Sequence, residues 1–274
     1  PSSALEPAVS KPHPQCNHNT IVTPPSTPTA LASTAYQLFE DIRDVYAALT
    51  HLPSLAPGPE INALLTRLVD LCIQPYGEAF SKYFFSLQGA SSLCESLRPL
   101  CGAAEGELER YWAERILGSS SSSSDRYRSA YIHNIDRDVC ALKISAALAQ
   151  RCGYAARMTF SCEEVGGIDE SRSPSARDSE EFCVSHMSNW RSFDVVFLAA
   201  LVGMNSSSKI QMLASLARKL ERGTLVVARS AWGVRGVLYP VLELSNDLLD
   251  AGYEVLGAVH PWTKVVNSVV VLRV

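Results

Sequence analysis

The chain has 274 residues, 47% of them hydrophobic and 19% charged, with a formal net charge of −4. This length predicts one large domain or two small ones around a sizeable core. The mildly acidic balance argues against nucleic acid as a partner. No apolar run approaches the roughly 18 residues that a membrane helix needs, so we expect no membrane partner either.

The first 30 residues are rich in Pro, Ser and Thr and predict a disordered tail, without the apolar stretch of a secretory signal. The eight cysteines form no CxxC pair and fall mainly in apolar segments, which favours reduced thiols in a cytoplasmic protein. In this tail, "HPQCNH" could bind a metal in isolation, but its surroundings provide no supporting shell, so no metal site is expected.

Residues 31–118 predict a helical domain. Apolar residues recur at helical spacing in "STAYQLFEDIRDVYAAL" and in "PEINALLTRLVDLCI", where Pro59 suits a helix start. Two further helices are expected, one near residues 91–97 and one in "AAEGELERYWAERIL". A run of serines then opens a linker over residues 119–128.

Residues 129–274 alternate between strand and helix patterns, which is typical of a doubly wound, Rossmann-like sheet. Strands are predicted at 130–135, 157–161, 193–198, 224–228, 253–259 and 266–272, and helices at 138–150, 206–220 and 241–251. The apolar run "FDVVFLAAL" predicts a parallel strand covered on both faces. The short "PWTK" link predicts an antiparallel hairpin at the sheet edge, and residues 166–188 predict a long insertion.

Several carboxylates occupy positions where chemistry is conceivable. Asp136 ends a strand and could hold two ribose hydroxyls or cap the next helix, a role that Asp138 could also fill. Glu163 and Glu164 also end a strand and could face an adenine edge or lie in solvent. Glu105 and Glu109 share one helix face, where close carboxylates raise each other's pKa and either could act as a base; a solvated face is the alternative.

The stretch "RSAWGVRGVLYP" follows a strand and places arginines and aromatics at the carboxyl end of the sheet. It could form a carboxylate-binding wall or be an ordinary loop whose arginines pair with surface acids. His260 also ends a strand, where a lone histidine is more often structural than catalytic.

Seven stretches together resemble the nicotianamine synthase family. They are "LPSLAPGPEINALLTRLVDLC", "AEGELERYWA", "NIDRD", "RMTFSCEEV", "DVVFLAALVGM", "LVVARSAWGVRGVLYP" and "YEVLGAVHPWTKVVNSVVV". The resemblance implies an N-terminal helical domain followed by a Rossmann-like domain of the methyltransferase type. It also implies condensation of three S-adenosylmethionine molecules by aminocarboxypropyl transfer, releasing methylthioadenosine and giving a metal chelator. S-adenosylmethionine is then the substrate, no prosthetic group is required, and a homodimer is allowed.

The resemblance also implies roles for individual residues. Glu105, with Glu109 close behind, becomes the base that deprotonates the attacking amine. For the donor nucleoside, the resemblance implies Asp136 at the ribose and Glu164 at the adenine side, with Glu163, Leu198 and Ala199 as further residues of the binding pocket. The resemblance implies that substrate carboxylates are bound by Arg229, Arg235 and Tyr239. His260 is also predicted to bind substrate.

The chain departs from the family in one region. It lacks the family's tyrosine-rich segment and the first strand with its "GSGPLP" turn, and passes from "RYWAERILG" through the serine run to "SAYIHNID". The missing strand would be central in the sheet, so its loss leaves ladder groups and apolar faces without partners. Two alternatives follow: an inactive, truncated relative or binding module, and an ordinary methyltransferase, which nothing beyond the alternation of strands and helices favours.

Overall fold

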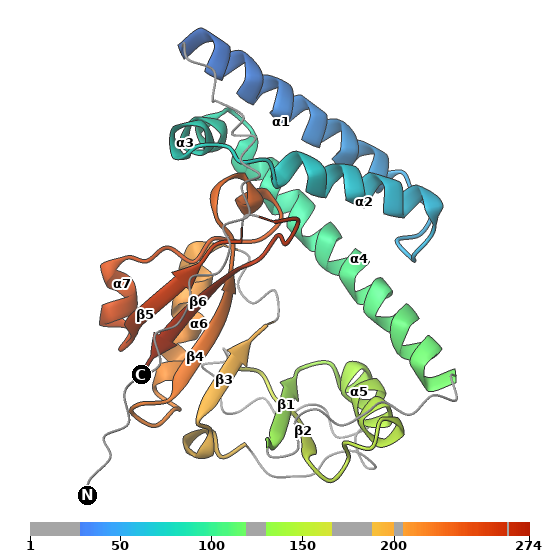
Figure 1. Ribbon diagram of the computed structural model, residues 1–274, viewed down its shortest axis with the longest axis vertical. Helices are drawn as coiled ribbons and strands as arrows, with labels where there is room; N and C mark the ends of the chain where they lie inside the picture. The colour runs from blue at the N-terminus through green and yellow to red at the C-terminus, as the bar shows by residue number, and fades with distance from the viewer. Residues whose placement is uncertain (1–27, 119–129, 166–187, 200–204, 262) are drawn as a thin grey trace, which may run out of the picture.

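A computed structural model of the protein describes residues 28–118, 130–165, 188–199, 205–261 and 263–274 (Figure 1). The helices α1 (Pro28–Thr50), α2 (Pro59–Cys72) and α3 (Glu78–Ser86) gather at one end of the molecule. The long helix α4 (Ala90–Gly118) starts among them and runs past the strands toward α5 (Val139–Arg151). The α/β class predicted from the sequence is confirmed, while the predictions for the tail, the serine linker and residues 166–187 lie outside the described residues.

The helical half follows the apolar periodicity of the sequence. In α1 the buried side chains Leu38, Ile42, Val45 and Leu49 lie on one face, and α2 begins with Pro59 directly after Gly58. Proline suits this first turn because its missing N–H would have no intrahelical partner there. In α1 the apolar positions of the sequence are the buried ones, and in α2 the proline lies where a helix start was predicted.

The expectation of two separate helices between residues 91 and 117 is wrong, because α4 is one continuous helix with Pro99 inside it. An interior proline removes one hydrogen bond and crowds the preceding turn, at a cost of about 3 kcal/mol. Buried side chains on both sides, Leu93 and Leu97 before it and Cys101 and Ala104 after it, hold the helix against its neighbours. This packing offsets the local cost, and it carries the glutamate-bearing half of α4 out beside the sheet.

The strands lie close to their predicted positions. They are β1 (Ile132–Asp136), β2 (Met158–Cys162), β3 (Val195–Leu198), β4 (Leu225–Ser230), β5 (Glu254–Val259) and β6 (Ser268–Arg273). β5 and β6 form the expected antiparallel hairpin, with β5 at the edge. α6 (Ser206–Ala217) is confirmed, but α7 covers only Asn246–Asp250, less than the predicted 241–251. The preceding stretch instead contributes buried side chains such as Leu242 to the core.

Among the described residues the sheet is divided into two parts. β1 pairs in parallel with β2, and a second sheet has the order β3-β4-β6-β5, with β3 and β4 parallel. No Cα atom of β1 lies within 8 Å of one in β3, although paired strands stand about 4.8 Å apart. The division falls in the centre of the sheet, where the sequence predicts a missing strand.

The division also explains a wrong expectation about β3. Its apolar run predicts a strand covered on both faces, but Phe197 is 73% exposed and Val195 41% exposed, while Leu198 is buried. Phe197 and Val195 share a face because side chains alternate along a strand. In the described part of the chain, that face of β3 has little cover.

A polar bridge joins the two sheets. The Glu163 carboxylate, just after β2, accepts hydrogen bonds from the Ser188 backbone N–H at 2.7 Å and from the Trp190 indole N–H at 3.3 Å. The His133 ring of β1 hydrogen-bonds the Ser188 hydroxyl at 2.7 Å and stacks on Phe193 at 5.6 Å between centroids. These contacts tie β1 and β2 to the segment that leads into β3.

Two apolar cores hold the described residues together. One lies between α6, α7 and the four-stranded sheet, with Leu213, Leu216 and Leu272 fully buried. The other is formed by α1–α4 together with the segment after β4, from which Val234, Val237 and Leu238 are buried among the helices. The loop that leaves the sheet at β4 is therefore anchored in the helical core.

Candidate functional site

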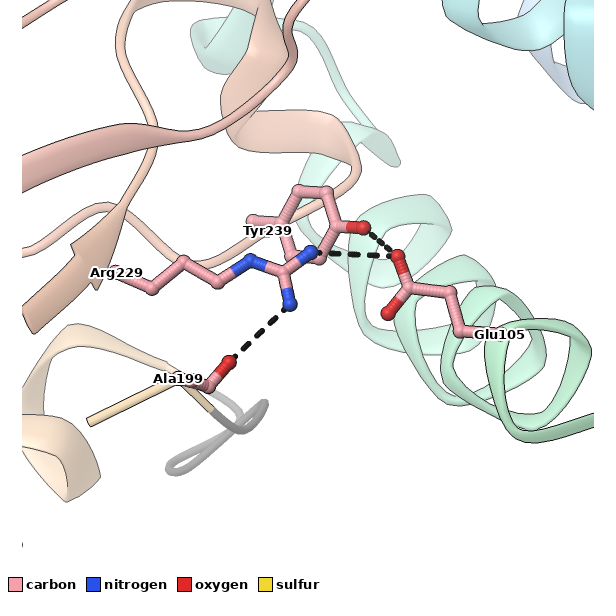
Figure 2. A network of polar contacts seen from close by, with 4 residues as sticks. All are labelled: Glu105, Ala199, Arg229 and Tyr239. Carbon is pink, nitrogen blue, oxygen red and sulfur yellow. Dashed lines mark hydrogen bonds and ion pairs between the residues drawn. The ribbon is translucent and has the colours of Figure 1, made fainter. Parts of the chain in front are cut away.

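A polar network forms where α4 meets the ends of β3 and β4 (Figure 2). The Tyr239 hydroxyl donates to Oε1 of Glu105, and Nη2 of Arg229 lies 3.4 Å from the same oxygen. Nη1 of Arg229 donates to the Ala199 carbonyl at 3.2 Å, and its guanidinium carbon lies 4.3 Å from the centroid of the Tyr239 ring. Four predicted site residues, Glu105, Arg229, Tyr239 and Ala199, are thus brought together.

The surroundings make the Glu105 carboxylate more basic than an ordinary glutamate. Burial raises its pKa, the Arg229 charge opposes this, the Glu109 charge raises the pKa further, and the Arg229 hydrogen bond lowers it. The side chain retains 36% of its exposure, so solvent still reaches it. Glu109 lies one turn farther along α4 and is exposed. Of the two predicted bases, Glu105 is therefore the one held in a network.

The loop between β4 and Tyr239 includes the short 3-10 helix η2 (Gly233–Val237) and is fixed by close packing. A Cβ at Gly236 would lie 3.0 Å from the ring of Phe85 and 3.1 Å from a methyl of Val241, so a larger residue would fit only if these two side chains shifted. Nη2 of Arg98 on α4 donates to the Gly236 carbonyl at 2.5 Å. The backbone that presents Tyr239 is therefore held from two helices.

Lys209 of α6 belongs to this neighbourhood, although the sequence reading did not single it out. It is 4% exposed, and Nζ donates to the carbonyls of Arg229 at 2.8 Å and of Pro240 at 3.2 Å. Burial lowers its pKa to about 8, with the charges of Arg229 and Arg98 adding to the effect. Its spacing from the buried Met212, Leu213 and Leu216 is a signal that could have found it, because a lysine there interrupts an apolar helix face.

Arg235 and His260, both predicted to bind substrate, are engaged elsewhere. Arg235 is buried, and its Nη2 donates to the carbonyls of Ile73 and Thr263, each at 3.2 Å. The His260 ring stacks on Trp232 at 5.6 Å, and its Nδ1 lies 2.9 Å from the Ser268 hydroxyl. These contacts connect segments of the fold to one another and do not reach Glu105.

The acids at the ends of β1 and β2 have distinct roles. Asp138 caps α5 by accepting from the Cys140 N–H at 2.8 Å, so the cap does not fall to Asp136, which is exposed at the strand end and accepts from the Asp138 N–H at 2.9 Å. Burial raises the pKa of Glu163, but hydrogen bonds from Ser188 and other neighbours outweigh it and bring the pKa below its ordinary value. Glu164 is exposed beside it. Leu198, the last residue of β3, is buried.

A hollow of about 450 Å³ lies apart from this network, between α3 and the start of η2. Its lining combines Glu78, Ser81, Lys82, Phe85, Ser86, Trp232, Gly233 and Val241. Within the described ranges, no group of three or more His, Cys, Asp or Glu side chains is arranged to hold a metal ion. No helix in the same ranges is long and apolar enough to cross a membrane.

Comparisons with known proteins agree on one family. The family model described as nicotianamine synthase protein matches residues 32–126 and 180–274. Nicotianamine synthase 2 of Oryza sativa subsp. japonica is 30% identical over 271 residues, which cover 86% of this chain and 82% of the relative. Probable nicotianamine synthase 3 of Hordeum vulgare is also 30% identical, with 86% of this chain and 79% of the relative covered.

Solved structures agree at the level of the fold. MtNAS in complex with MTA and tNA superposes with a TM-score of 0.60 at 13% identity, covering 86% of this chain and 97% of the other. A glutamate-to-glutamine mutant of MtNAS in complex with S-adenosylmethionine gives a TM-score of 0.60 at 14% identity, with the same coverage.

Proposed function

Because this chain belongs to the nicotianamine synthase family, we propose that it condenses three S-adenosylmethionine molecules by aminocarboxypropyl transfer to give nicotianamine. The observation that carries the proposal is the Glu105 carboxylate, held by Tyr239 and Arg229 at the junction of α4 with the sheet. It provides a base of raised pKa beside residues from both halves of the chain.

The chemistry needs a base and a leaving group. An amine nitrogen attacks the carbon next to the sulfonium sulfur, a new C–N bond forms, and the C–S bond breaks. The electron pair of that bond stays on sulfur, so methylthioadenosine leaves as a neutral thioether. The nitrogen gives up a proton, and the carboxylate of Glu105 is the acceptor. Because the sulfur of the donor carries a positive charge, methylthioadenosine leaves without further activation.

Tyr239 and Arg229 orient the Glu105 carboxylate. Both bind Oε1, which leaves Oε2 to face an incoming amine. The guanidinium of Arg229 also lies over the Tyr239 ring in a cation–π contact, so displacement of either side chain would weaken the position of the other. We assign Arg229 a second role, the binding of a substrate carboxylate through its partly exposed edge.

The nucleoside part of the donor is assigned to the strand ends. Asp136, exposed at the end of β1, accepts the ribose hydroxyls, and Leu198 and Ala199 at the end of β3 line the pocket. Glu164 is the adenine-side acid, because the carboxylate of Glu163 already binds Ser188 and Trp190. Contacts to Ile73 and Thr263 count against Arg235 as a direct substrate ligand.

The test is incubation of the folded protein with S-adenosylmethionine, with products identified by mass spectrometry. Methylthioadenosine together with nicotianamine supports the proposal. S-adenosylhomocysteine would instead indicate a methyltransferase. Glu107 provides a matched control, because it lies on the same helix and pairs with Arg110 at 2.6 Å at the surface. Glu105→Gln is expected to abolish most turnover, and Glu107→Gln to preserve it.

One observation favours the second candidate, a relative that binds the donor without turnover. The sheet is divided between β1 and β3, where the family's first strand and glycine-rich turn are missing from the sequence. That turn would contact the methionine part of the donor. Stoichiometric binding of S-adenosylmethionine without release of methylthioadenosine would establish this candidate. A chimera with a strand and glycine-rich turn inserted between Gly118 and Ser129 is then expected to gain turnover.

The biological setting is a further part of the proposal. A product with several amine and carboxylate groups chelates transition metals, so a role in metal homeostasis follows from the reaction. Five described cysteines are free thiols, which fits a reducing compartment such as the cytoplasm; they are Cys72, Cys94, Cys101, Cys140 and Cys152. Fluorescence imaging of the tagged full-length protein in its own cells tests the location.

A further inference from the structure

Lys209 of α6 reaches both ends of the loop between β4 and Pro240. Its ammonium group bonds the carbonyl of Arg229, near the end of β4, and the carbonyl of Pro240. One carbonyl is that of Arg229 itself, and the other belongs to Pro240, which directly follows Tyr239. One side chain thus joins the start and the end of the loop.

Burying the ammonium group of Lys209 costs free energy, so its presence inside the protein calls for an explanation. The neighbouring buried positions of α6 are Met212, Leu213 and Leu216, and an apolar side chain at position 209 would continue that face. An ammonium group taken from water loses solvation that two carbonyl bonds restore only in part. Arg229 and Arg98 are the charged groups that act on it most, and both repel it.

The geometry of the network explains what Lys209 does. Arg229 and Tyr239 reach the same oxygen of Glu105 and also stack on each other, so their backbone positions must match closely. Relying on the proposed function above, we propose that Lys209 is a positioning residue for aminocarboxypropyl transfer. By bonding both loop ends, it holds Arg229 and Tyr239 together against Glu105.

The test compares Lys209→Met with Lys143→Met, which removes an exposed lysine of α5 as a matched control. We expect Lys209→Met to lower kcat for methylthioadenosine release by about tenfold or more while KM changes less than about threefold. Lys209→Arg retains charge and donors and is expected to recover part of kcat. A lower Tm with unchanged kcat in the folded fraction would assign Lys209 to stability alone.

A double-mutant cycle tests whether Lys209 acts through its neighbour. In an Arg229→Met background, the further change Lys209→Met is expected to cost little, because the side chain it positions is gone. Equal costs in both backgrounds would overturn the proposal. If Lys209→Met does not fold, Lys209→Gln, which keeps amide donors in the same direction, replaces it in both backgrounds.

Hydrogen exchange gives a readout that does not depend on turnover. Loss of the two carbonyl bonds is expected to speed amide exchange over residues 229–242 in Lys209→Met, and not in Lys143→Met. Unchanged exchange there would overturn the positioning role. If the parent protein forms no methylthioadenosine but Lys209→Met still loosens this segment, the proposed function fails while the structural half of the inference stands.

Discussion

Replacing Glu105 with glutamine removes a proton acceptor while preserving the size and shape of the side chain. The amide oxygen can still accept from the Tyr239 hydroxyl and from Arg229, which lies 3.4 Å away, so the network keeps its geometry. General-base catalysis contributes about 10²–10⁴-fold, which is about 3–5.5 kcal/mol of barrier. We therefore expect kcat for methylthioadenosine release to fall within that range.

Stability is expected to respond differently. Because burial raises the pKa of Glu105, the folded protein favours the protonated side chain, and this contribution is lost as pH rises through the raised pKa. Glutamine stays neutral, so it avoids burying the charge but weakens two charge-assisted hydrogen bonds by about 1 kcal/mol each. These effects oppose each other, and the free energy of unfolding is expected to stay within about 1 kcal/mol of the parent.

The assay measures methylthioadenosine release at saturating S-adenosylmethionine, alongside unfolding in urea, for Glu105→Gln and the surface control Glu107→Gln. Retention of more than about a tenth of the parent rate by Glu105→Gln would refute its role as the base, since general bases contribute at least about 100-fold. Equal losses of rate in both variants would show that the substitutions act by disturbing α4, and not by removing the Glu105 carboxylate. Glu109→Gln is then the next variant to measure.

Three further predictions follow from the same contacts. Arg229→Met should move the acidic limb of kcat/KM to higher pH, because the Arg229 charge lowers the pKa of Glu105; Glu109→Gln should move the limb to lower pH, because the Glu109 charge raises that pKa. Identical limbs would contradict both signs. Asp138→Ala should lower the free energy of unfolding by about 1 kcal/mol in urea titrations, because it removes the cap of α5. Phe197→Ser should change the free energy of unfolding by less than about 0.5 kcal/mol, because the side chain is 73% exposed. A larger loss, with a change in sedimentation, would reveal a partner on β3, such as the second subunit of a homodimer.

Much of the fold could be predicted from local pattern. The terminal hairpin, the amphipathic helices and five-residue β1 and β2 follow from apolar period and turn residues, which act over short distances. The continuity of α4 through Pro99 could not be predicted, because the packing that offsets the proline comes from residues far away in the chain. The exposure of Phe197 depends likewise on which strand stands beside β3.

The sequence by itself determined the family, the α/β class and the residue types available for chemistry, and it predicted the loss of a central strand where the described sheet is divided. The tertiary structure decided which of these residues meet. It joined Glu105 to Arg229 and Tyr239, turned Arg235 toward Ile73 and Thr263, and placed the unanticipated Lys209 between two carbonyls. The physical reason is that residue pattern governs burial along one helix or strand, whereas a hydrogen bond between residues more than a hundred positions apart depends on how whole elements pack.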